Sequence, residues 1–169
     1  LEDDVFIISS DLGGGFQNDR VKVALKRRRG SGRREGSVVE VLNRSRTQFV
    51  GVIEISEKFA FVRPMDTKVY TDFFIQQGNT GGAKSGDKVL IEMISWENLR
   101  NSPMAKVVQV LGAPGEHNTE IHAILAEYGL PYQFEADVEA YANQIDTRIL
   151  PEEVARRRDF RETLTFTID

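Results

Sequence analysis

The chain contains an internal repeat, and this repeat limits the folds that the sequence can adopt. Residues 4–7, Asp-Val-Phe-Ile, return 68 positions later as residues 72–75, Asp-Phe-Phe-Ile. Residues 38–42, Val-Val-Glu-Val-Leu, return 69 positions later as residues 107–111, Val-Val-Gln-Val-Leu. The second copy carries two additional β-like runs ahead of its repeated part, which the first copy lacks. We therefore expect two similar domains, the first of them incomplete, in a chain that is a piece of a longer protein.

The second copy contains five runs with the alternating apolar pattern and the flanking turn residues of β-strands. The expected strands are Phe49–Ser56, Phe59–Arg63, Asp72–Gln76, Lys88–Ser95 and Ala105–Leu111. Five short strands with a longer connection before the fourth match the five-stranded OB barrel. The first copy supplies only the last three strands of a like barrel, which we expect at Val5–Ile8, Arg20–Leu25 and Ser37–Leu42.

After Gly112 the apolar period changes from 2 to 3.6, which is typical of helices. Ile121, Ile124, Leu125 and Tyr128 share one face of the first expected helix, and Asn118 or Thr119 can cap its start. A second helix is expected over Glu135–Ile145 and a third from Pro151, and residues 164–169 alternate like a strand. We divide the chain into residues 1–46, the end of a first OB domain, residues 47–112, a second OB domain, and residues 113–169, a helical linker that enters another domain.

The net charge of −4 is strongly segregated along the chain. Residues 20–34 hold eight basic side chains and no acid, whereas residues 115–153 hold nine acids and one arginine. The arginine cluster within this run, at residues 26–34, falls between strands four and five of the first barrel, in a loop through which OB barrels commonly bind oligonucleotides. A solvated charged loop is the alternative interpretation. The candidate phosphate-binding residues are Lys26, Arg27, Arg28, Arg29, Arg33 and Arg34.

Aromatic residues of the second barrel form a second candidate site. Phe59 and Phe61 are two positions apart on one strand, so their rings lie on the same face, and Phe74 on a neighbouring strand can join them. Such a platform stacks unpaired bases, and nearby cations can meet phosphates. The cations are Lys58 and Arg63, with Lys68 also near in sequence, and Phe6 is the equivalent of Phe74 in the first copy. The alternative is that these rings fill the barrel core, as either Phe73 or Phe74 must by alternation.

Several other classes of function lack support in the sequence. The chain has no cysteine, which excludes disulfides and thiolate metal sites and fits a reducing compartment. We expect a cytoplasmic location without a membrane, because no apolar run approaches the roughly 20 residues of a membrane span. His117 and His122 are five positions apart on a helix, so they do not share a face, and no other ligands complete a metal site.

The order of these parts resembles the RNase II/RNase R (RNB) family of 3′→5′ exoribonucleases over almost the whole chain. The resemblance is carried by residues 33–42 (Arg-Arg-Glu-Gly-Ser-Val-Val-Glu-Val-Leu), 50–52, 59–64 (Phe-Ala-Phe-Val-Arg-Pro), 107–112, 158–162 and 166–169 (Phe-Thr-Ile-Asp). It implies two cold-shock-type OB domains ahead of a catalytic domain that holds Mg²⁺ in an aspartate cluster. Asp169 matches the first of those aspartates, as a catalytic and metal-binding residue of the intact enzyme only.

These observations predict a mainly β protein with tandem cold-shock-type OB barrels, the first incomplete, followed by a short helical segment. We expect it to bind single-stranded RNA as the N-terminal region of a hydrolytic exoribonuclease involved in RNA degradation. The alternative is a non-catalytic cold-shock-type RNA-binding protein or RNA chaperone. A protein-binding OB module would leave the arginines unexplained. Alone, the chain is expected to hold no cofactor and to be inactive. Its first copy should either pack on the second barrel or pair with another copy.

Overall fold

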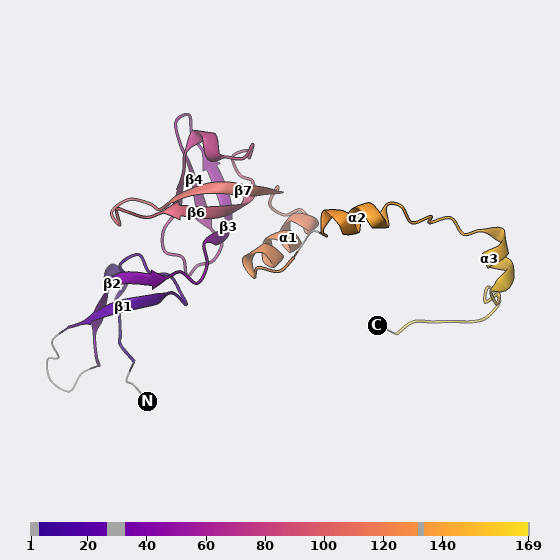
Figure 1. The fold of residues 1–169 in the computed structure, drawn as a ribbon, viewed down its shortest axis with the longest axis horizontal. Coiled ribbons are helices and arrows are strands. Elements are labelled where there is room, and N and C mark those ends of the chain that lie inside the picture. Colours follow the sequence, from indigo (N-terminus) through magenta and orange to yellow (C-terminus); the bar gives the residue numbers. More distant parts are fainter. Residues whose placement is uncertain (1–3, 27–32, 132–133, 169) are drawn as a thin grey trace. The chain divides into compact units, whose positions relative to one another are not determined.

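The computed structural model describes residues 4–26, 33–131 and 134–168, and the chain divides into two compact units, residues 1–132 and 133–169 (Figure 1). The first unit holds seven strands and one helix within its described residues. These are β1 (Arg20–Leu25), β2 (Gly36–Asn43), β3 (Gln48–Ile55), β4 (Ala60–Pro64), β5 (Phe73–Ile75), β6 (Lys88–Ser95), β7 (Met104–Gly112) and α1 (His117–Glu127). Single 3₁₀ turns lie at η1 (Ser9–Asp11) and η2 (Gln77–Asn79). The second unit holds α2 (Ala136–Ala142) and α3 (Pro151–Arg156).

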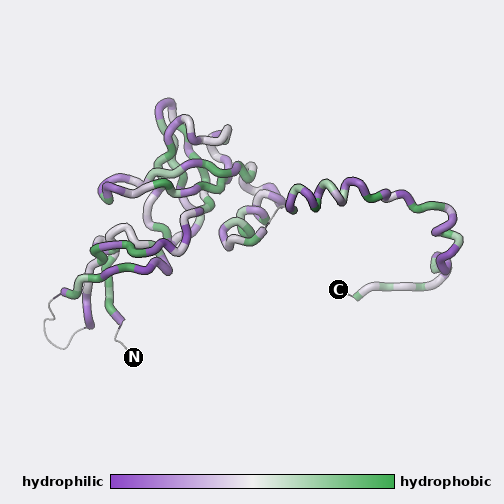
Figure 2. Tube along the Cα trace, in the orientation of Figure 1, coloured by the Kyte–Doolittle hydropathy of each residue, from purple (hydrophilic) through white to green (hydrophobic). Residues whose placement is uncertain are grey.

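Strands β3 to β7 form the closed five-stranded barrel that the sequence predicts, in the order β3-β4-β5-β7-β6. All neighbours are antiparallel except β5 and β7, which run parallel. Alternate side chains point inward, so hydrophobic positions recur along the strands while the turns between them are hydrophilic (Figure 2). The barrel core contains Phe49, Ile53, Ala60, Val62, Phe73, Ile75, Val89, Ile91 and Ala105. Tandem OB-type architecture with an incomplete first copy is therefore confirmed.

The first copy reproduces part of the second barrel in space as well as in sequence, as two strands and one isolated bridge. Strands β1 and β2 form an antiparallel pair, as their equivalents β6 and β7 do. Phe6 makes a parallel bridge with Glu35, as Phe74 does with Met104. The strand expected at Val5–Ile8 is reduced to this single bridge. The physical reason is that the described residues provide no first-copy equivalent of β4 to pair with its other edge.

Phe16 attaches the first copy to the second barrel. Its side chain is buried in the barrel core, with its ring centroid 5.4 Å from that of Phe49 and 5.5 Å from that of Trp96. Arg44 covers the same ring at 5.0 Å and donates hydrogen bonds to the carbonyl oxygen of Gly14 (2.6 Å) and to Asp19 Oδ2 (2.7 Å). The first copy therefore packs against the complete barrel, which is one of its two expected arrangements.

Helix α1 packs on the outside of the barrel. The face of the helix that contacts the barrel is not the one that carries its apolar stripe. The buried side chains are Thr119 and Ala123, which pack toward Val50 and Leu90, whereas Ile124 is 52% exposed. Small residues allow the helix to approach the strands closely, and larger ones would hold it away. The helix begins at His117, so the predicted caps Asn118 and Thr119 lie inside its first turn. Thr119 Oγ1 instead donates to the carbonyl oxygen of Leu111 (3.3 Å).

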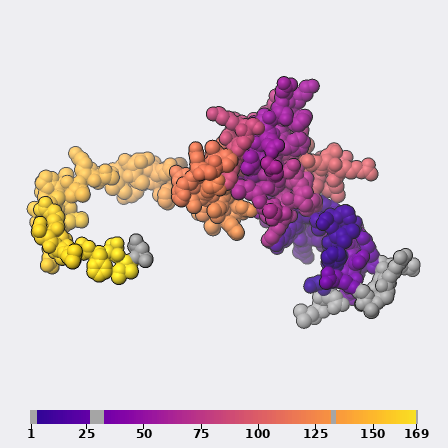
Figure 3. Space-filling view, turned by 180° about the vertical axis from the view of Figure 1, so that it is seen from behind, coloured from indigo at the N-terminus to yellow at the C-terminus, as the bar shows by residue number. Residues whose placement is uncertain are grey.

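The second unit consists of α2 and α3 joined and followed by irregular chain (Figure 1). Its atoms are coloured orange to yellow in the space-filling view (Figure 3). Helix α2 is shorter than the predicted Glu135–Ile145, and α3 begins at Pro151 as predicted. Residues 164–168 are not a strand, so that prediction is wrong for the described residues. A strand requires a neighbour for its backbone hydrogen bonds, and none of the described residues provides one. Within the described ranges no helix is long and apolar enough to cross a membrane.

Candidate nucleic-acid interface

Three phenylalanine rings gather on the outer face of the second barrel. Phe61 lies between the other two, with ring centroids 5.5 Å from Phe59 and 5.5 Å from Phe74, both edge to face. Phe59 is 43% exposed, whereas the next residue, Ala60, is buried in the core. The sequence left open which of Phe73 and Phe74 faces the barrel core. In the structure Phe73 is fully buried and Phe74 faces outward. We call Phe59, Phe61 and Phe74 the aromatic platform.

The strand register places two rings of the platform, Phe61 and Phe74, in a row that crosses four strands. Glu54 on β3 pairs with Phe61 on β4, which pairs with Phe74 on β5, which pairs with Met104 on β7. Adjacent strands are about 4.8 Å apart, so these side chains lie beside one another across the sheet. Sequence reasoning missed Glu54 and Met104. Alternation indicates that both face outward, but only the register reveals that they flank the rings.

Two predicted cations lie at the platform. Arg63 is exposed on the same face of β4 as Phe61, and its guanidinium donates a 3.0 Å hydrogen bond to Glu54 Oε1. Lys58 is exposed in the turn directly before Phe59. Lys68 lies elsewhere, because it lines a cavity beside Phe16 rather than the platform. The platform therefore combines apolar ring surface with an ion pair at its β3 edge and a lysine near its start.

Part of the predicted basic site is also assembled in the first copy. Phe6 is 44% exposed, and the guanidinium carbon of Arg33 lies 5.4 Å from its ring centroid. The backbone N–H of Phe6 donates to the carbonyl oxygen of Arg34 (2.8 Å), which fixes the aromatic residue beside the arginines. Lys26 forms an ion pair with Asp11 and donates a hydrogen bond to its carboxylate. This hydrogen bond raises the pKa of Lys26. Arg27, Arg28 and Arg29 lie outside the described residues.

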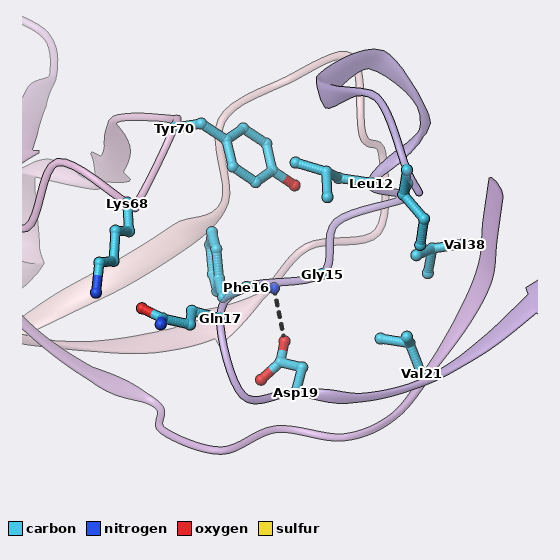
Figure 4. Close-up of a pocket in the computed structure, with 10 residues that line it drawn as sticks. Leu12, Gly15, Phe16, Gln17, Asp19, Val21, Val38, Lys68 and Tyr70 are labelled. Atoms are coloured by element: carbon cyan, nitrogen blue, oxygen red, sulfur yellow. Dashed lines mark hydrogen bonds between the residues drawn. The ribbon is translucent and has the colours of Figure 1, made fainter. Parts of the chain in front are cut away.

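A cavity of about 420 Å³ lies between the first copy and the barrel (Figure 4). Its walls are mainly apolar, and Figure 4 shows Leu12, Val38 and Val21 facing Phe16 and Tyr70 across it. Asp19 also lines the cavity, and its carboxylate accepts hydrogen bonds from the backbone N–H groups of Phe16 (2.8 Å) and Ser45 (2.8 Å). The lining residues are Ile7, Leu12, Gly15, Phe16, Gln17, Asp19, Val21, Val38, Lys68 and Tyr70.

Candidate metal ligands are sparse in the part of the chain that the structure describes. No group of three or more histidine, aspartate and glutamate side chains there is arranged to hold a metal ion. Asp169, which the family resemblance marks as a metal ligand, lies outside the described residues. His117 is exposed and His122 is half-buried on α1. The described face of the protein therefore offers stacking and charge rather than a metal centre.

Known proteins resemble this chain both in sequence and in fold. A cold shock domain family profile matches residues 61–135. Ribonuclease R of Thermotoga maritima is 34% identical over 136 residues, which cover 79% of this chain and 19% of that protein. The chain therefore spans about a fifth of the length of this relative. The sequence resemblance to the RNase II/RNase R family is confirmed by these matches.

Two solved structures share the fold. Mycoplasma genitalium RNase R in complex with ribose-methylated single-stranded RNA superposes with a TM-score of 0.70 at 18% identity, over 84% of this chain and 23% of that one. Yeast Ssd1, a pseudonuclease, superposes with a TM-score of 0.64 at 22% identity, over 77% of this chain and 22% of that one. One of these folds thus belongs to a ribonuclease and the other to a pseudonuclease.

Proposed function

We propose, from the premise that this chain is homologous to part of ribonuclease R, that it binds single-stranded RNA through the aromatic platform. The observation that carries the proposal is the row of outward side chains in which Phe61 and Phe74 lie on adjacent strands. The two ring centroids are 5.5 Å apart, and each ring can stack one base. The Mycoplasma relative was solved with single-stranded RNA, which supports this ligand class.

Charge should supplement stacking in two places. Lys58 stands beside the first ring of the platform, where it can meet the phosphate of a stacked nucleotide. The first-copy patch of Phe6 and Arg33 repeats the combination of a ring with a cation. The sequence adds further cations to this segment, namely Lys26, Arg34 and the arginines at positions 27–29. Phosphate contacts would hold the RNA without reading its sequence, so affinity should fall as salt concentration rises.

The test is binding of labelled single-stranded RNA by Phe61→Ala and Phe74→Ala variants. Each should lose affinity by about 1–3 kcal/mol, the usual worth of one stacked base. The slope of affinity against salt should stay unchanged, because no charge is removed. Phe160→Ala, an exposed ring of the second unit, is the matched control. Affinity unchanged in both platform variants, with folding intact by circular dichroism, would refute the platform.

For the longer protein we propose a Mg²⁺-dependent 3′→5′ exoribonuclease that acts in RNA degradation. Aspartates would hold the ions, which activate water and stabilise the leaving oxygen. Asp169 would contribute one ligand, and further anionic ligands must come from other residues, since one carboxylate does not hold such ions. The fold is shared by a pseudonuclease, so a non-catalytic RNA-binding protein remains the alternative, with the same platform.

This chain alone should not degrade RNA, with or without Mg²⁺ or Mn²⁺. The reason is the ligand count, because only Asp169 matches the metal-binding set of the family. A time course on 5′-labelled single-stranded RNA tests this, and an Asp169→Ala variant identifies contaminating nuclease. Stepwise shortening from the 3′ end that disappears in the variant would show that the chain carries an active site.

We also propose that the incomplete first copy allows two chains to associate. Ile7 and Val21, which line the open cavity, are the repeat equivalents of Ile75 and Val89, which are fully buried in the second barrel. Strand β1 pairs only with β2 among the described residues, so its outer edge offers backbone groups to a partner strand. Sedimentation velocity at rising concentration should detect a dimer, and a Val21→Lys variant should remain monomeric. A monomer at all concentrations would contradict the proposal.

A further inference from the structure

The aromatic row ends at an exposed ion pair on β3 and β4. Glu54 occupies the position on β3 directly opposite Phe61, and Arg63 lies two residues beyond Phe61 on the same face of β4. Their side chains are 63% and 68% exposed, and the hydrogen bond from Arg63 to Glu54 Oε1 is 3.0 Å long. Paired residues on adjacent strands have Cβ atoms about 5 Å apart. A base stacked on the Phe61 ring would therefore present an edge to this pair.

We propose that the Glu54–Arg63 pair selects guanine at the position stacked on Phe61, an inference that rests on the RNA-binding function proposed above. In such a complex Arg63 would supply an N–H donor and Glu54 its two acceptor oxygens. The Watson–Crick edge of guanine offers the complement, with the O6 acceptor followed by the N1–H and N2–H donors. Guanidinium has five N–H donors, so Arg63 can keep its bond to Glu54 and still donate to O6.

The other bases fit this pair less well. Uracil has one donor, N3–H, between two acceptor oxygens, so one of its oxygens would face a Glu54 oxygen. Adenine and cytosine place an amino donor where Arg63 also donates, and a ring nitrogen acceptor where Glu54 accepts. Each mismatch leaves like groups opposed, which costs more than a missing bond because the stacked base excludes water from them. The pair therefore discriminates by repulsion as well as by attraction.

The carboxylate of Glu54 also affects RNA affinity through its negative charge. This effect must be distinguished from direct recognition of the base. Glu54 is an acid on a face that should meet a polyanion, and it offsets the charge of Arg63. Removing it should strengthen binding to every RNA by lowering repulsion of phosphates. Glu57, exposed in the turn between β3 and β4, carries the same charge but lies off the row. A change of base preference, rather than of overall affinity, is thus the signature of direct recognition.

The test measures binding of single-stranded RNA octamers in which uridine alternates with guanosine, inosine, adenosine or cytidine. The wild-type chain should prefer the guanosine octamer to the adenosine and cytidine octamers by about fivefold, the low end for a bidentate contact. Inosine lacks only the N2 amino group and should lie between. Glu54→Gln should abolish the preference, because an amide cannot accept both hydrogen bonds. Glu57→Gln should change affinity for all octamers alike and keep the preference.

Three outcomes would overturn the inference. The first is equal binding of all octamers by the wild-type chain, and the second is a guanosine preference that survives in Glu54→Gln. Both leave the proposed function intact, because RNA is still bound. Absence of binding to every octamer, with the barrel folded by circular dichroism, would instead remove the proposed function together with this inference.

Discussion

Phe16 and Trp96 lie face to face, with ring centroids 5.5 Å apart and ring planes 25° apart, although they belong to different copies of the repeat. Tyr70 approaches both rings, at 5.7 Å from Phe16 and 6.1 Å from Trp96. The first copy thus completes the hydrophobic core of the second. The two copies should consequently unfold together rather than as separate domains.

Replacing Phe16 with alanine should destabilise the whole first unit. A buried phenylalanine shortened to alanine leaves a cavity and usually costs about 3–5 kcal/mol. Urea unfolding followed by Trp96 fluorescence measures this loss. Phe6→Ala is the control, because it removes an exposed ring of the same copy and should cost much less. Similar losses in both variants would show that Phe16 contributes no special core packing.

A chain truncated after Arg46 should not fold. The first copy keeps a two-stranded sheet, and its best-buried ring lies in the core of the other copy. An isolated pair of strands is marginally stable at best in water. Circular dichroism of residues 1–46 should show an unfolded chain, and a cooperative melt from that piece would contradict this expectation.

Replacing Arg27, Arg28 and Arg29 together with alanine should weaken binding to single-stranded RNA of any sequence. These side chains lie outside the described residues, so the prediction comes from their place in the repeat. Phosphate contacts release counterions, so the variant should also show a shallower dependence of affinity on salt. The matched control replaces Arg156, Arg157 and Arg158, which removes the same charge from the second unit. An equal effect of the two triple variants would point to net charge alone.

The stability of the first unit should fall in acid through Asp66. Burial favours the neutral form, but hydrogen bonds from the Lys68 backbone and from Arg46 outweigh it, so the pKa of Asp66 lies below its ordinary value of 3.8. The unfolded chain therefore binds a proton more readily than the folded one. This stabilisation is complete above pH 3.8 and is lost as the pH falls through the lowered pKa.

Asp66→Asn tests the pH prediction. The variant should have a lower melting temperature than the wild type at neutral pH, and the difference should shrink below pH 3.8. Asp72→Asn, which removes an exposed carboxylate of the same barrel, is the control for the change of charge. A constant difference between Asp66→Asn and wild type across the acid range would exclude Asp66 as the source.

Much of the barrel could be read from the sequence because period-2 alternation reports which side chains face inward. Strand β6 has the predicted bounds, and the other strands of the barrel differ by one residue at each end. The helix face was harder to predict. On α1 the apolar stripe stays largely exposed while Thr119 and Ala123 are buried, since the shape of the barrel surface favours small side chains there.

The sequence by itself determined the repeat, the five-stranded barrel, the basic loop and the outward pair Phe59 and Phe61, because all of these are local patterns. Only the tertiary structure decided which residues meet across strands. It brought Glu54 and Met104 to the ends of the aromatic row and buried Phe16 in the core of the other copy. Register and docking depend on contacts between residues far apart in sequence, and no local periodicity encodes them.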